Sequence, residues 1–142
     1  MRGPSLTVAA SAALFAGCGA AGSDDPRQAV VEAFGVHQSA LLDEDAETYC
    51  GTLTADAEDE ILATVAGLGR GISGCEKSAE AIFEFAGKRE RRRVERAREE
   101  VTTADVRLRG RRAGITLPSG RVLDMRQEDG EWLVADPSAN RK

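Results

Sequence analysis

Apolar residues recur at helical spacing through the first part of the chain, and the first such stripe predicts a helix over residues 26–42. Asp25 suits the N-cap of this helix, and Pro26 suits its first helical position. The acidic residues 43–45 end the stripe. The stripe contains Val30, Phe34, His37 and Leu41, and Val31 and Leu42 widen it.

Two more helical stripes follow. The pattern over residues 46–65 predicts a second helix, although Thr54 can restart a helix and two shorter pieces are the alternative. A third helix is predicted to begin at a capping box made by Ser73 and Glu76, and to end at Gly87 as its C-cap.

Residues 88–100 form a run of charges with Val94 and Ala97 as its only apolar members. Opposite charges four residues apart support a solvated helix. The alternative is an exposed basic patch that meets anionic lipid headgroups or wall polymer. The arginines central to that patch are Arg91, Arg92, Arg93 and Arg96.

The last forty residues change to strict alternation, which predicts four strands joined by turns at 110–111, 118–120 and 129–130. Pairing residues across each turn gives three registers that agree on one apolar face, and a one-residue slip at any turn would break this agreement. The apolar face contains Ala104, Val106, Leu108, Ala113, Ile115, Leu117, Leu123, Met125, Trp132 and Val134. The opposite face is polar, includes Asp105 and Asp124, and is either solvated or covered in a homodimer.

The predicted fold class is therefore α+β, with three N-terminal helices packed on a curved four-stranded antiparallel meander sheet. The chain carries a net charge of −5, which argues against a nucleic-acid partner because such proteins need a basic surface.

The N-terminus has the pattern of an export signal, with Arg2 ahead of an apolar run too short to span a bilayer. The run ends in Leu14-Phe15-Ala16-Gly17-Cys18, which resembles the lipobox of bacterial lipoproteins. This resemblance implies a signal peptide over residues 1–17, a lipidated Cys18 at the start of a flexible tether over 18–25, and anchoring to the outer face of the cell membrane. The alternative is a plain secretory signal that leaves Cys18 as a free thiol.

Two cysteines remain besides Cys18. In an exported chain, Cys50 and Cys75 are expected to form a structural disulfide, and both lie on the buried sides of their helices. A metal site is the rival interpretation, but His37 is the only histidine and no CxxC spacing occurs, so neither metal nor cofactor is predicted.

The order of helices and strands, the two helical cysteines and the Trp132-Leu133-Val134 ending after Asp129-Gly130 resemble small exported members of the nuclear-transport-factor-2-like (cystatin-like, cone-shaped) superfamily. The resemblance covers residues 26–137 and leaves 138–142 as a disordered tail. It implies a cone between helices and sheet. The residues expected to line a pocket in that cone are Phe34, His37, Tyr49, Phe83, Met125 and Trp132.

The resemblance implies that enzymes of this superfamily place carboxylates, Tyr or His inside the cone, whereas here Asp105 and Asp124 fall on the outward face and no inward carboxylate accompanies His37. The sequence therefore favours a non-catalytic, membrane-anchored binding module for a small apolar ligand or a partner protein. One alternative is a structural or interaction domain with a filled cone. The other is an isomerase- or dehydratase-like enzyme that uses His37 and Tyr49.

Overall fold

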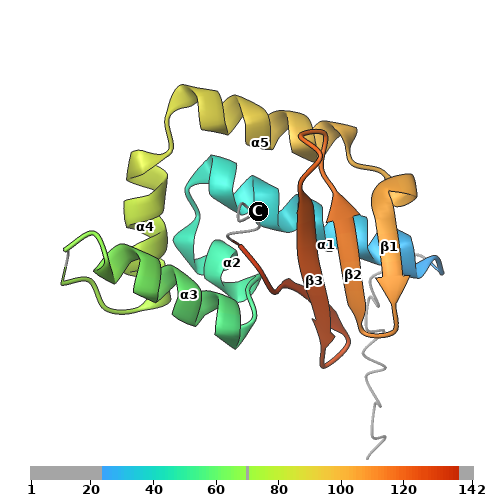
Figure 1. The fold of residues 1–142 in the computed structure, drawn as a ribbon, viewed down its shortest axis with the longest axis horizontal. Helices are drawn as coiled ribbons and strands as arrows, with labels where there is room; N and C mark the ends of the chain where they lie inside the picture. Colours follow the sequence, from blue (N-terminus) through green and yellow to red (C-terminus); the bar gives the residue numbers. More distant parts are fainter. Residues whose placement is uncertain (1–23, 70, 138–142) are drawn as a thin grey trace, which may run out of the picture.

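The computed structural model describes residues 24–69 and 71–137, and over these ranges the chain is an α+β domain (Figure 1). Five α-helices and one four-stranded antiparallel sheet make up this described part. The predictions for the signal peptide, for Cys18 with most of its tether, and for the tail 138–142 lie outside the described residues.

Helix α1 (Pro26–Asp43) confirms the first helical prediction and ends one residue later. The Asp25 carboxylate accepts a hydrogen bond from the backbone N–H of Arg27, and Pro26 occupies the first turn. The helix ends where Glu44 adopts the left-handed conformation, with φ at 58°.

The second predicted helix forms the two shorter pieces, α2 (Ala46–Gly51) and α3 (Ala55–Ala66). The residues between them pair with the last strand instead of continuing the helix. The Thr54 N–H donates to the Val134 carbonyl at 3.0 Å, and the Val134 N–H donates to the Thr52 carbonyl at 2.8 Å. Thr54 then caps α3 through its side chain, which accepts from the N–H of Ala57.

Helix α4 (Cys75–Phe85) corrects two predictions about its ends. Its N-cap is Gly74, whose φ of 92° is favourable only for glycine, so the capping box predicted at Ser73 does not form. Its C-cap is Ala86, and Gly87 instead is the N-cap of the next helix.

The charge run forms helix α5 (Lys88–Glu100), as the solvated-helix interpretation predicts. Together with the division of the second predicted helix into α2 and α3, it accounts for the five helices of the described part, where the predicted fold class has three. Helix α5 is not fully solvated, because it contacts α1 along its length and buries Val94 and Ala97 (Figure 1). Arg91 donates from Nη1 to the Leu42 carbonyl at 3.1 Å and forms an ion pair with Glu44. A side chain of α5 thus satisfies a carbonyl in the last turn of α1.

The sheet contains β1 (Val106–Arg109), β2 (Arg112–Thr116), β3 (Val122–Glu128) and β4 (Glu131–Val134), in the order β1-β2-β3-β4. All three predicted registers are confirmed. The two-residue turn between β3 and β4 has positive φ at both central residues, Asp129 and Gly130, as a type I′ hairpin requires. Ala104 is the exception on the apolar face, because it is exposed within a 3₁₀ turn (Thr103–Asp105).

The core lies between α1 and the apolar face of the sheet. Val30 and Phe34 of α1 are buried in one cluster with Ile115 and Met125. The same buried cluster continues into α2, α3 and α4, which pack together and which Figure 1 shows away from the sheet. Among residues 24–69 and 71–137, no helix is long and apolar enough to cross a membrane.

Candidate ligand-binding cavity

A cavity of about 280 Å³ lies between α1, α5 and the turn that joins β2 to β3. It is close to the lower end of the range of small-molecule sites, roughly 300–1,000 Å³. Its apolar lining is contributed by Leu41, Val94, Ala97, Leu117, Pro118, Leu123 and Pro137. Its polar lining is contributed by His37, Gln38, Tyr49, Glu90, Arg93, Arg96, Ser119 and Arg121.

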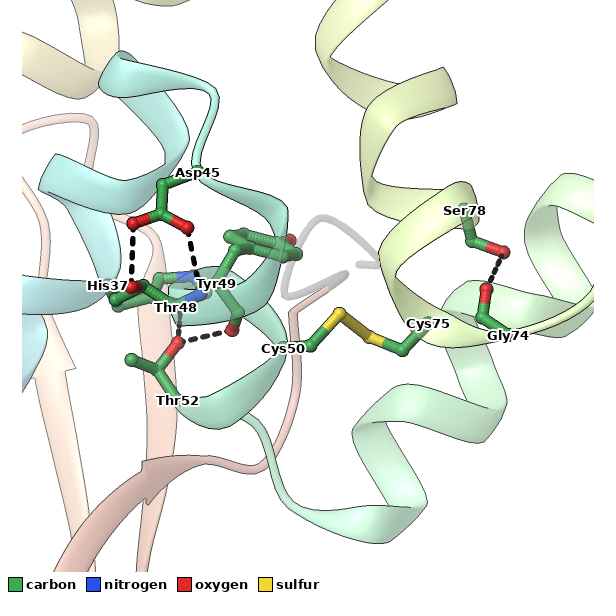
Figure 2. The surroundings of a disulfide bond; sticks show 9 residues. All are labelled: His37, Asp45, Thr48, Tyr49, Cys50, Thr52, Gly74, Cys75 and Ser78. Carbon is green, nitrogen blue, oxygen red and sulfur yellow. Dashed lines mark hydrogen bonds between the residues drawn. A yellow bond between two sulfur atoms is a disulfide. The ribbon is translucent and has the colours of Figure 1, made fainter.

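His37 and Tyr49, the two titratable residues predicted for a pocket, both line this cavity. Nδ1 of His37 lies 2.7 Å from the Thr52 hydroxyl, and Figure 2 shows α2 presenting Tyr49 and Thr52 to this imidazole. The Thr52 hydroxyl donates its single proton to the Tyr49 carbonyl at 2.6 Å. It can therefore only accept from His37, which places the imidazole proton on Nδ1 and leaves Nε2 with a lone pair.

Burial controls the protonation of both side chains. It lowers the pKa of His37 from 6.5 to about 4, because the imidazolium would lose its hydration. It raises the pKa of Tyr49 from 10.0 to about 12, because the phenolate is disfavoured in the same way. Both groups are neutral at pH 7.

Arginines dominate the charged part of the lining. Among the described residues that line the cavity, Arg93, Arg96 and Arg121 face a single carboxylate, Glu90. Glu90 already pairs with Arg93 at 2.9 Å. The cavity is therefore electropositive, although the whole chain is acidic.

Arg121 is distinct from the other two arginines. Its Nε is buried and has no hydrogen-bond partner in the part of the chain that the structure describes. The position is held by a backbone hydrogen bond of 2.7 Å, which the Leu117 N–H donates to the Arg121 carbonyl across the turn. Leu117 lies on the predicted apolar face, so its cross-turn partner Arg121 lies on that inward face as well.

The other residues predicted to line a pocket do not line this cavity. Phe34, Phe83, Met125 and Trp132 are all buried members of the hydrophobic core. Sequence reasoning missed Gln38 and Arg121. The sequence contained a signal for both. Gln38 follows Phe34 by four residues and so lies on the same side of α1. The predicted pairing of Ile115 with Leu123, continued by two residues, pairs Leu117 with Arg121.

The four arginines predicted to form a basic patch do not share one face of the helix, because only residues three or four apart lie on the same side. Arg91 binds the end of α1, Arg93 and Arg96 line the cavity, and Arg92 is exposed. Arg96 makes a distant ion pair, with its Nε 3.9 Å from a carboxylate oxygen of Glu100. Whether this helix meets an anionic surface stays a prediction.

Cys50 and Cys75 lie at disulfide distance, with their sulfurs 2.02 Å and their Cα atoms 6.0 Å apart. Figure 2 shows the bridge joining α2 to α4. It lies close in sequence to the His37 contacts, because Cys50 directly follows Tyr49 and precedes Thr52 by two residues. The bridge therefore fixes the short helix that carries the partners of His37.

General acid–base chemistry with His37 would need a carboxylate within hydrogen-bond reach of the same substrate. Glu90 is the carboxylate among the described lining residues, and it already pairs with Arg93 at 2.9 Å. The two candidate carboxylates lie elsewhere, because Asp105 accepts from the N–H of Thr102 and Asp124 is exposed on the outward side of β3. No group of three or more His, Cys, Asp or Glu side chains suited to a metal ion occurs within the described ranges.

Comparison of the chain with models of protein families, with curated proteins and with solved structures finds no match.

Proposed function

We propose that this protein is a non-catalytic binding module, attached to the outer face of the cell membrane by lipid on Cys18, whose cavity holds a small ligand. The observation that carries the proposal is the cavity between α1, α5 and the β2–β3 turn. It combines an apolar wall with a few polar groups, and this combination is typical of small-molecule sites.

The state of His37 supports binding over catalysis. A general base works best with a pKa near the working pH, whereas burial lowers the pKa of His37 to about 4. Its Nδ1 proton is also engaged by Thr52, which suits a fixed structural contact rather than proton exchange with a substrate.

The proposal extends to the fold family and to the attachment. Helix α1 packed on one face of an antiparallel meander, with further helices beside it, is the arrangement that the nuclear-transport-factor-2-like resemblance implies. The sequence pattern that ends at Cys18 supports the lipid anchor. Because a lipoprotein cysteine carries at least two acyl chains, such an anchor would be stable.

Native mass spectrometry of the full chain, released gently from its own membranes, tests the binding proposal. We expect a small molecule to accompany the wild type. Ala97→Leu should remove it, because Ala97 is buried in the cavity wall and the larger side chain would occupy the ligand's space. Ala63→Leu, on the exposed side of α3, is the matched control and should retain the molecule.

Two outcomes would contradict the proposal. A bare mass for the wild type would favour the structural alternative, a domain whose interior needs no ligand. Isomerase, dehydratase or hydrolase turnover that His37→Ala reduces about a hundredfold, with the fold intact, would favour the enzyme alternative.

A further inference from the structure

The cavity has a feature that a site for a purely apolar ligand would not need. The buried Nε–H of Arg121 has no acceptor among the described residues, and an unpaired buried donor is costly to the folded state. The retention of such a donor at a cavity wall is explained if a ligand supplies the acceptor.

The charges around the cavity favour an anionic acceptor. Arg93 and Arg96 add to Arg121, and Glu90 is the single carboxylate among the described lining residues. Because Glu90 is engaged by Arg93, it leaves the positive field at Arg121 largely uncompensated. A guanidinium pairs bidentately with a carboxylate or a phosphate, and the apolar part of the lining favours the carboxylate of an organic acid.

The neutral polar groups fix the ligand's orientation. His37 uses its only N–H on Thr52, so its other nitrogen has a lone pair and offers nothing to an anion. An anionic end would therefore pair with Arg121, and the apolar residues Leu41, Val94 and Leu123 would contact the rest of such a ligand.

We infer that the cavity binds a small organic carboxylate, with the carboxylate held by Arg121 and a short apolar body against α1 and α5. The inference rests on the proposed binding function and narrows it to a ligand class. A volume of about 280 Å³ suits a compact acid rather than a long acyl chain.

The test uses two probes of the same shape, 4-fluorobenzoate and 4-fluorobenzamide, titrated into the full chain and followed by ¹⁹F NMR. A charge-assisted hydrogen bond distinguishes them, so we expect the carboxylate to bind at least about tenfold tighter than the amide. Inorganic phosphate, which lacks the apolar body, should not displace the carboxylate at equal concentration.

Arg121→Gln should bring the two affinities to within about threefold of each other, because it removes the charge and the Nε–H together. Arg121→Lys keeps the charge without the fork of donors, and should give an intermediate ratio. Arg92→Gln is the matched control, since Arg92 is an exposed arginine outside the cavity, and should leave the ratio unchanged. If Arg121→Gln does not fold, Arg96→Gln tests whether the positive charge around the cavity favours the carboxylate. It should lower the ratio of the carboxylate affinity to the amide affinity by about threefold.

Equal binding of the two probes by the wild type would overturn the carboxylate inference and leave the binding proposal standing. An unchanged ratio in the folded Arg121→Gln variant would also overturn it. If neither probe binds, the carboxylate inference is also wrong. The proposed binding function fails only if the native mass spectrum of the wild type shows the bare mass of the chain.

Discussion

The imidazole of His37 stacks on the ring of Tyr49, with centroids 4.8 Å apart and planes inclined by 28°. Tyr49 in turn meets Phe83 edge to face, at 5.4 Å and 84°. These three rings connect α1, α2 and α4, so His37 is part of a packed aromatic cluster as well as of the cavity wall. The same burial that holds the imidazole in place keeps it neutral.

The stability of the fold should therefore depend on pH through His37. Burial places the pKa of His37 at about 4 in the folded state, against 6.5 for an unperturbed histidine. Between these values the unfolded chain binds a proton that the folded chain does not, so stability is complete above pH 6.5 and falls as pH decreases. We expect a loss of about 1 kcal/mol between pH 7 and pH 5.5.

Urea unfolding at the two pH values, compared with His37→Gln, isolates this effect from the titration of carboxylates. The variant should lose the histidine-dependent part of the change. Since the chain has a single histidine, its imidazole signal in NMR also reports the pKa directly. A signal that titrates near pH 6.5 would contradict the account.

The bridge between Cys50 and Cys75 should contribute substantially to stability. It closes a loop with a sequence separation of 25, for which the loss of either cysteine is expected to cost about 2–4 kcal/mol. The double variant Cys50→Ala, Cys75→Ala gives the same loss with no unpaired thiol, and urea unfolding measures it. Peptide mass analysis without reduction should show the two cysteines joined, and free thiols at both positions in exported protein would refute the bridge.

Arg91 should stabilise the junction of α1 and α5. Arg91→Gln removes the donor to the Leu42 carbonyl and the ion pair with Glu44, both at partly exposed side chains. Because solvent screens such a pair, we expect a loss of only about 1 kcal/mol, most of it from the hydrogen bond. Arg92→Gln, one position along and exposed, should change stability by less than about 0.5 kcal/mol. Equal losses in the two variants would show that the contact with α1 contributes nothing.

Attachment to the membrane should depend on Cys18. Cys18→Ala is expected to leave uncleaved precursor or to release soluble protein, because the acyl chains that would anchor the mature chain can no longer be added. Cell fractionation with mass analysis distinguishes these forms from the wild type. Retention of a cleaved, unlipidated form in the membrane fraction would exclude lipid anchoring through this residue.

The strand registers were predictable because three independent turns had to agree on one apolar face. A shift of one residue at any turn would move every side chain of a strand to the opposite face. The break between α2 and α3 was open in the sequence, because it is decided by Val134, some eighty residues away, which pairs with the backbone of Thr52 and Thr54. Local propensity carries no information about such a pairing.

The cavity was predictable only in part. His37 and Tyr49 follow from a helical stripe, but the sequence places no limit on how closely α5 approaches α1. That approach brings Val94, Ala97 and two arginines of a charged run to the cavity, in a segment whose composition is typical of a solvated helix. Arg121 lies at an inward register position, where charged residues are rare. This was the clearest signal of the site in the sequence, and the prediction did not use it.

The most direct test of the central claim is a crystal structure of the chain isolated from its own membranes. We predict electron density for a small molecule between α1, α5 and the β2–β3 turn, with an acceptor atom within hydrogen-bond distance of Arg121 Nε. A cavity closed by side chains, or one that contains only ordered water, would contradict the account.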